Sequence, residues 1–211
     1  MRLRNIKNAK EKLEKYQELV HPDPFQNHGK WQEIFKNTNP LHLEIGMGKG
    51  KFIWENAIKN PHINFLGLEV SSSIMLRAAR KIIVARPANL YLINIDANEL
   101  NQVFGKEEVT KIYLNFSDPW PKNRHEKRRL TSESFLKLYQ EILIDNGEIE
   151  LKTDNRNFYE YSLISLNNFG YKFLEVNLNL HENNTEEIIT TEYEEKFKQL
   201  GKTIYYLKVM K

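Results

Sequence analysis

The chain has 211 residues, of which 40% are hydrophobic and 28% are charged, and its formal net charge is +3. This composition is typical of a soluble globular protein with one or at most two domains. The absence of cysteine excludes disulfides and thiolate metal sites, and the six histidines lack close ligand spacing, so we expect no metal. The sequence has no run of ~20 apolar residues and no apolar segment after its basic start, so we expect no membrane anchor, no signal peptide and a cytoplasmic location.

Residues 1–20 carry six Lys/Arg and three Glu, with partial helical spacing of apolar residues toward the end. We interpret residues 1–40 as a basic N-terminal arm with short helices, and whether the arm is ordered stays open. The remainder, 41–211, is expected to form one domain.

Apolar runs bounded by turn residues predict five strands, and helical spacing predicts a helix after each of them. The strands are expected at 41–46, 63–69, 90–95, 111–116 and 147–152, and the helices at 51–59, 71–85, 97–103, 131–143 and 155–168. This alternation predicts a doubly wound, mostly parallel α/β sheet. Two further strands, 171–179 and 203–210, have no helical crossover pattern between them, so we expect seven strands with an antiparallel last strand.

A glycine-rich loop follows the first predicted strand, and acidic residues stand at the ends of the first four. The loop contains Gly46, Gly48 and Gly50 directly after Glu44, and the later acids are Glu69, Asp96 and Asp118. Glycines let the backbone approach a ligand closely, although a loop of this kind alone also fits a tight turn. An acid about twenty residues after such a loop accepts hydrogen bonds from ribose hydroxyls. Acids would repel a pyrophosphate but suit a nucleoside that bears a cation, which describes S-adenosylmethionine.

A basic block follows Asp118 and the two prolines at 119 and 121. From Lys122 to Arg129 the chain carries five Lys/Arg and one Glu. A carboxylate at a strand end beside a basic block indicates a site for an anionic substrate, because open α/β sheets bind ligands at that edge. The alternative is that Asp118 caps a turn and that the block is the solvated start of a helix.

The sequence resembles the bacterial tRNA (guanine-N7-)-methyltransferases, which have the Rossmann-like fold of class I S-adenosylmethionine-dependent methyltransferases. The resemblance covers about Leu41 to the C-terminus. Its motifs are Glu44–Gly50, Phe116–Leu130 with Asp-Pro-Trp-Pro-Lys and Arg-His-x-Lys-Arg-Arg, and Thr191–Glu194 with Phe197 and Gly201.

The resemblance implies S-adenosylmethionine as the cofactor, S-adenosylhomocysteine as its product and tRNA as the partner, with methylation at guanine 46 of the variable loop. It implies cofactor contacts at Glu44, Glu69, Asp96 and Asp118. It implies substrate contacts at Lys122, Asp154, Thr191, Glu192, Tyr193 and Glu194. It implies RNA contacts along Arg124, His125, Glu126, Lys127, Arg128 and Arg129. From the residues alone, Asp154 would be a helix cap and Glu192–Glu195 an acidic helix start. We expect no obligatory protein partner, and the chain is either a monomer or a homodimer.

Guanine N7 has an in-plane lone pair and can attack a sulfonium methyl group without losing a proton, so no general base is needed. Alignment and electrostatics are then the main sources of catalysis. Asp118 is the catalytic candidate, either by accepting from guanine N1–H and the 2-amino group or by its charge. Trp120 either stacks on a base or packs inside the protein. The alternative functions are methylation of another substrate, such as another RNA position, and RNA binding without catalysis, which S-adenosylmethionine binding would distinguish.

Overall fold

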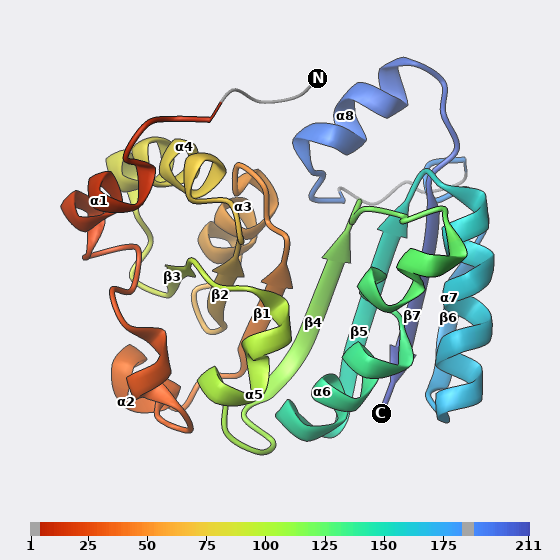
Figure 1. The fold of residues 1–211 in the computed structure, drawn as a ribbon, viewed down its shortest axis with the longest axis horizontal. Coiled ribbons are helices and arrows are strands. Elements are labelled where there is room, and N and C mark those ends of the chain that lie inside the picture. The colour runs from red at the N-terminus through yellow and green to blue at the C-terminus, as the bar shows by residue number, and fades with distance from the viewer. Residues whose placement is uncertain (1–4, 183–187) are drawn as a thin grey trace.

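The structure is a computed structural model that describes residues 5–182 and 188–211. Its centre is a seven-stranded sheet with the order β3-β2-β1-β4-β5-β7-β6 (Figure 1). The strands are β1 (Leu41–Ile45), β2 (Asn64–Leu68), β3 (Leu90–Ile93), β4 (Val109–Asn115), β5 (Leu143–Thr153), β6 (Lys172–Asn177) and β7 (Tyr205–Met210). Neighbouring pairs from β3 to β5 are parallel, whereas β7 runs antiparallel to both β5 and β6. The predicted sheet with an antiparallel last strand is confirmed.

Helices cover both faces of the sheet (Figure 1). The α-helices are α1 (Ala9–Leu13), α2 (Trp31–Phe35), α3 (Lys51–Lys59), α4 (Ser72–Ile82), α5 (Leu100–Val103), α6 (Glu133–Ile142), α7 (Arg156–Phe169) and α8 (Glu192–Gln199). The short 3-10 helices are η1 (Glu14–Tyr16), η2 (Pro24–Asn27), η3 (Ile83–Ala85), η4 (Ala97–Glu99) and η5 (Asn123–Arg128). No helix within the described ranges has the length and apolar content to cross a bilayer.

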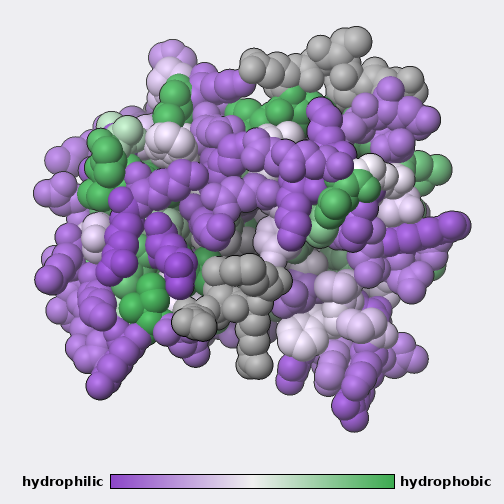
Figure 2. Space-filling model, turned by 90° about the horizontal axis from the view of Figure 1, so that it is seen from above, coloured by the Kyte–Doolittle hydropathy of each residue, from purple (hydrophilic) through white to green (hydrophobic). Residues whose placement is uncertain are grey.

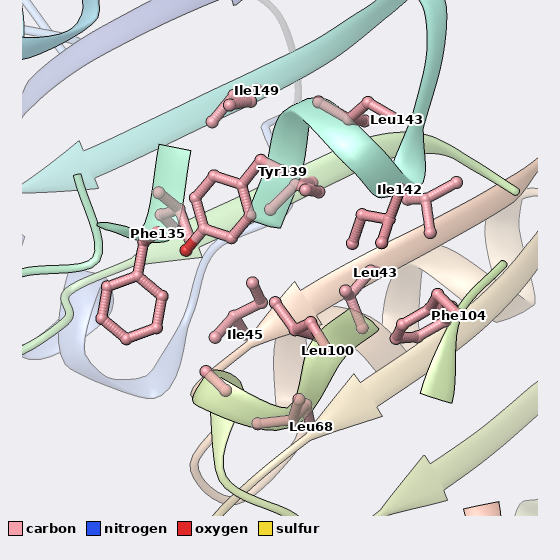
Figure 3. Close-up of a cluster of buried hydrophobic side chains, with 14 of the residues drawn as sticks. Leu43, Ile45, Leu68, Leu100, Phe104, Phe135, Tyr139, Ile142, Leu143 and Ile149 are labelled. Atoms are coloured by element: carbon pink, nitrogen blue, oxygen red, sulfur yellow. The ribbon is translucent and has the colours of Figure 1, made fainter. Parts of the chain in front are cut away.

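Two hydrophobic clusters hold the helices on the sheet. The larger cluster joins α5, α6 and α7 to one face, and Figure 3 shows Leu43, Leu100, Tyr139 and Ile142 meeting there. The second cluster joins α1, α3 and α4 to the other face. Burial of such side chains contributes about 1.5–3 kcal/mol each before the cost of ordering the chain, which makes the sheet a rigid support for its loops.

The boundary between α6 and β5 differs from the prediction. Leu143 was expected on the apolar face of the helix, but α6 ends at Ile142 and Leu143 begins β5. Leu143 is nevertheless buried in the same cluster as α6. The hydrophobic pattern is therefore the same on both sides of residue 143 and does not indicate where α6 ends. Asn146 has a φ of 61°, and the register of β4 and β5 shifts after Val109, so the first part of β5 is irregular.

The described part of the N-terminal arm packs on the domain. Leu13, Leu19 and Val20 are buried in the second cluster, and Val20 forms a parallel bridge with Leu92 beside β3. The indole N–H of Trp31 donates to the Val103 carbonyl at 3.1 Å. Residues 5–40 are thus ordered against the sheet, whereas the domain boundary at residue 40 stays a prediction.

Candidate active site

The carboxyl ends of β1, β2, β3 and β4 lie at one edge of the sheet, and they carry the four acids singled out from the sequence (Figure 1). After β1 the chain continues to β2 and β3 on one side, and after β3 it returns to form β4 on the other side of β1. Open α/β sheets bind ligands at such a reversal. A pocket of about 330 Å³ lies there. Its lining includes Glu44, Gly46, Met47, Gly48, Lys49, Gly50, Lys51, Phe52, Ile74, Asn115, Phe116, Thr191, Glu192, Tyr193 and Lys196. Figure 2 looks onto this edge, and hydrophilic side chains dominate the view.

The glycine-rich loop has the left-handed backbone that glycine accepts readily. Gly46, Gly48 and Gly50 have φ values of 77°, 58° and 76°. A Cβ atom at Gly46 or Gly48 would meet open space, whereas one at Gly50 would lie 2.8 Å from Cδ1 of Ile82 in α4. The first two glycines therefore leave room for a ligand, and the third permits close packing of the loop on a helix.

Glu44 is buried at the wall of the pocket with half of its carboxylate unused. Its Oε1 accepts a hydrogen bond of 2.9 Å from the amide of Asn115, but its Oε2 is buried and has no well-formed hydrogen bond to any described residue. Burial raises the pKa of Glu44 to about 8, although Asn115, the charge of Lys152 and the nearby backbone N–H of Ile53 act in the opposite direction. A buried acid with a spare acceptor favours a ligand with hydrogen-bond donors or positive charge.

Glu69 connects the glycine loop to the start of α4. Its two carboxylate oxygens accept from the backbone N–H groups of Gly48, at 3.2 Å, and of Ser71, at 2.8 Å. Burial, with a smaller contribution from the charge of Asp118, raises the pKa of Glu69. Each oxygen retains a second lone pair, so the carboxylate can still accept from a ribose hydroxyl.

Asp96 and Asp118 differ in their local roles. The Asp96 side chain caps η4, accepting from the Asn98 backbone at 2.8 Å, and Glu99 completes a capping box. The Asp118 side chain is exposed and accepts no hydrogen bond from any residue that the structure describes. Asp118 is therefore not a turn cap, and its carboxylate is available to a ligand. Neither acid is among the described residues that line the 330 Å³ pocket, and Glu69 is also outside this lining, behind the glycine loop that it contacts.

Helix α8 covers one side of the pocket. Glu192 forms ion pairs with Lys49 at 2.7 Å and Lys81 at 3.5 Å, and Glu195 pairs with Lys51. These contacts join α8 to the glycine loop, to α3 and to α4. The exposed ring of Tyr193 lies at the pocket, so α8 presents an aromatic surface beside the glycine loop.

Glu194 is not among the described residues that line the pocket. It is completely buried, and both carboxylate oxygens lie 3.2 Å from Nζ of Lys152 at the end of β5. Nε2 of His181 lies 3.0 Å from Glu194 Oε1, and the Thr191 backbone N–H donates to Oε2 at 3.2 Å. Lys152 also donates to the Ile189 carbonyl at 3.2 Å. This buried network attaches the 189–194 segment to the sheet.

The other residues implied by the resemblance are distributed around this edge. Asp154 is half-buried and pairs with Lys202 at 3.2 Å, while the cap of α7 is its neighbour Asn155. Lys122 is exposed at the start of η5. The structure thus brings Glu44, Thr191, Glu192 and Tyr193 to one pocket and leaves Lys122 and Asp154 outside its lining.

The cations of the basic block differ in what they contact. Arg124, Lys127 and Arg128 are exposed on η5, and the guanidinium of Arg128 also lies 4.8 Å from the ring centroid of Trp120. Arg129 is half-buried, and its guanidinium donates from Nε and Nη2 to the Trp120 carbonyl, at 3.2 and 3.1 Å. Trp120 is half-buried, with the His125 ring edge-on at 5.6 Å.

Sequence reasoning missed Asn115, Lys152 and His181. A signal existed for Asn115, a polar residue within the apolar run 112–116, whereas Lys152 continues the alternation of polar and apolar residues over 148–152 and gave none. Asn115 pairs with Lys152 in the β4–β5 register, and Glu44 pairs with Tyr113, so the three side chains project on the same face. His181 lies in an irregular segment, where no pattern indicated its contact.

Residues 38–207 match a family model described as "Putative methyltransferase". A tRNA (guanine-N(7)-)-methyltransferase of Geobacillus sp. (strain WCH70) is 50% identical over 209 residues, covering 99% of this chain and 95% of the relative. The enzyme of the same description from Lysinibacillus sphaericus (strain C3-41) is 49% identical, covering 98% and 96%. Among solved structures, the 16S rRNA methyltransferase KamB superposes with a TM-score of 0.64 at 14% identity, covering 86% and 92%, which indicates a shared fold.

Proposed function

The chain belongs to the tRNA (guanine-N(7)-)-methyltransferase family, and we propose that it transfers a methyl group from S-adenosylmethionine to N7 of a guanine in tRNA. We include in the proposal that the guanine is position 46 of the variable loop and that the reaction takes place in the cytoplasm. The N7 edge lies in the major groove, which is deep and narrow in A-form RNA, so a base in an irregular region is the accessible target.

The observation that carries the proposal is the unused oxygen of Glu44 in a pocket whose glycine loop leaves room for a ligand. S-adenosylmethionine has a sulfonium, an ammonium group and two ribose hydroxyls, which would match the Glu44 carboxylate in the pocket wall and the Glu69 carboxylate that contacts the glycine loop. Glu44 would face a donor or cation, Glu69 would accept from the ribose, and Gly46 and Gly48 would pass close to the ligand. Asp96 would contribute only where a ligand extends beyond the 330 Å³ pocket.

When bound, S-adenosylmethionine supplies an electrophilic methyl group. The protein then needs to orient guanine N7 toward that group, and well-oriented reactants gain roughly 7–11 kcal/mol. The free carboxylate of Asp118 is the group proposed to accept from guanine N1–H and the 2-amino group. Its negative charge also stabilises the positive charge that develops on the purine.

The substrate contacts implied at residues 191–194 are unequal in this structure. Tyr193 is exposed at the pocket and is proposed to pack against the base. Thr191 and Glu194 cap α8 through a capping box, and Glu194 also pairs with Lys152, so we propose that these two position the helix. Lys122 and Asp154 are proposed to contact the nucleotide from outside the pocket.

The test is incubation of the protein with unmodified tRNA and labelled S-adenosylmethionine, followed by mapping of the methylated nucleotide. We expect label at N7 of guanine 46 and none in a tRNA whose guanine 46 is replaced. Label at another nucleotide would overturn the position, and a protein that binds both ligands without transfer would be an RNA-binding module.

Replacement of Glu69 by alanine is expected to weaken S-adenosylmethionine binding roughly tenfold to hundredfold, since a hydrogen bond to a charged group contributes about 1.5–3 kcal/mol. The loss includes the contact with Gly48, because the loop loses its acceptor. Calorimetry measures the affinity, and Glu160→Ala on the exposed side of α7 is the control. Unchanged affinity in a folded Glu69 variant would remove this residue from the site.

Replacement of Arg124 and Lys127 together by alanine is expected to weaken tRNA binding and to reduce the slope of log affinity against log salt by roughly one unit for each lost phosphate contact. Both side chains are exposed on η5, as is that of Arg128, which lies over the Trp120 ring. Lys106→Ala, in the loop before β4 at the opposite edge of the sheet, is the control. An unchanged slope would mean that η5 does not contact phosphates.

A further inference from the structure

We propose that Arg129 is a positioning residue, which holds the turn that carries Asp118, and that it does not bind RNA phosphate as its place in the basic block suggests. This inference rests on the proposed function, since the role of the turn is to present Asp118 to guanine.

The guanidinium of Arg129 is directed into the protein. Nε and Nη2 both donate to the carbonyl oxygen of Trp120, at 3.2 and 3.1 Å. The guanidinium carbon also lies 4.3 Å from the ring centroid of Tyr161 in α7. A forked pair of donors together with a flat face over an aromatic ring is an arrangement that arginine makes and lysine does not. Two of the five guanidinium N–H groups are used for the Trp120 carbonyl and one face of the group lies over Tyr161, so the side chain is held toward the turn.

The turn needs such support because its backbone provides none. Phe116 and Trp120 have φ values of 51° and 41°, in the left-handed region that is costly for residues other than glycine. Pro119 and Pro121 have no N–H to donate. Within the described chain, no backbone–backbone hydrogen bond involves residues 117–121. The Trp120 carbonyl is therefore the point at which a side chain fixes the turn, two residues after Asp118.

The fixed point on the other side is α7. Tyr161 projects from this helix, which packs through buried residues such as Phe158 and Leu166 into the main cluster. Arg129 thus connects the turn to the rigid part of the domain. A shift of about 1 Å in a catalytic group can cost roughly hundredfold in rate, so loss of this connection should affect turnover more than binding.

The test replaces Arg129 by lysine, which keeps the positive charge but not the forked donors. If Arg129 positions Asp118, turnover should fall roughly tenfold to hundredfold, with KM for tRNA and the salt slope of tRNA binding unchanged. Arg124→Ala should give the opposite pattern, a smaller salt slope and a higher KM for tRNA. Arg156→Lys, an exposed arginine of α7, is the matched control and should behave as the unchanged protein.

Near-normal turnover in Arg129→Lys, or a loss that follows tRNA affinity and disappears at saturating tRNA, would overturn the proposal. Calorimetry of S-adenosylmethionine and thermal unfolding report whether the variant is folded. If Arg129→Lys does not fold, Tyr161→Leu is the second variant, because it removes the ring beneath the guanidinium without changing any charge. Tyr161→Leu should lower turnover and leave the salt slope of tRNA binding unchanged. Normal turnover in Tyr161→Leu would also overturn the proposal. Failure of the unchanged protein to methylate tRNA would instead overturn the proposed function.

Discussion

Replacement of Lys152 by methionine is expected to destabilise the protein by about 3–5 kcal/mol and to weaken S-adenosylmethionine binding, because removing one partner of a buried ion pair leaves the other charge uncompensated. Glu194 is completely buried and Lys152 is 4% exposed, so little water screens the pair. Without Lys152, His181 is the remaining side-chain partner of the Glu194 carboxylate. The 189–194 segment should then leave the sheet and take Tyr193 away from the pocket.

Urea unfolding measures the stability and calorimetry the affinity. Lys172→Met on the exposed edge strand β6 is the matched control, and it should change the free energy of unfolding by less than ~0.5 kcal/mol. In a double-mutant cycle, Lys152→Met with Glu194→Leu should be less destabilised than the sum of the single variants, because neither charge is then left buried alone. Additive losses, or a single variant that is stable and binds normally, would show that the pair does not hold α8.

The sequence predicted the sheet and the cofactor edge because these depend on local patterns. Alternating apolar runs predicted the strands, and the loop after Glu44 needed glycines whose φ values are positive in the structure. The contacts of individual charged side chains could not be predicted from local patterns. Arg129 and Arg124 are equivalent in a string of basic residues, yet one meets the Trp120 carbonyl and the other faces solvent.

The same limit applies to Glu194. Its local pattern, Thr-x-x-Glu, predicts a capping box, and the structure contains one. The contact that defines its role joins it to Lys152, 42 positions away, and depends on how α8 packs over the end of β5. A buried pair between distant residues has no sequence periodicity, so the local pattern around Glu194 or around Lys152 could not indicate it.

Replacement of Asp118 by asparagine is expected to reduce turnover by roughly hundredfold while the protein remains folded, the range found when one group that stabilises a transition state is removed. The amide keeps the shape of the carboxylate but replaces one acceptor oxygen by an N–H donor. The N1–H and 2-amino groups of guanine would then face another donor, and the developing charge on the purine would lose its counter-charge. Single-turnover methylation of unmodified tRNA measures the rate.

This test is decisive because the Asp118 carboxylate forms no hydrogen bond with any described residue whose loss could change folding. Asp96 caps η4, and asparagine would replace it there at little cost, whereas the Asp118 carboxylate accepts no hydrogen bond from any described residue. Folding is therefore insensitive to Asp118→Asn, and a change in rate reports on the substrate. Asp145→Asn, 86% exposed near the start of β5 at the far edge of the sheet, is the matched control.

Since N7 carries no proton, the residual rate should show no general-base dependence on pH near neutrality. If the Asp118→Asn variant methylates tRNA at a rate close to that of the control, Asp118 has no part in catalysis, and orientation of guanine falls to Tyr193 and Asp154.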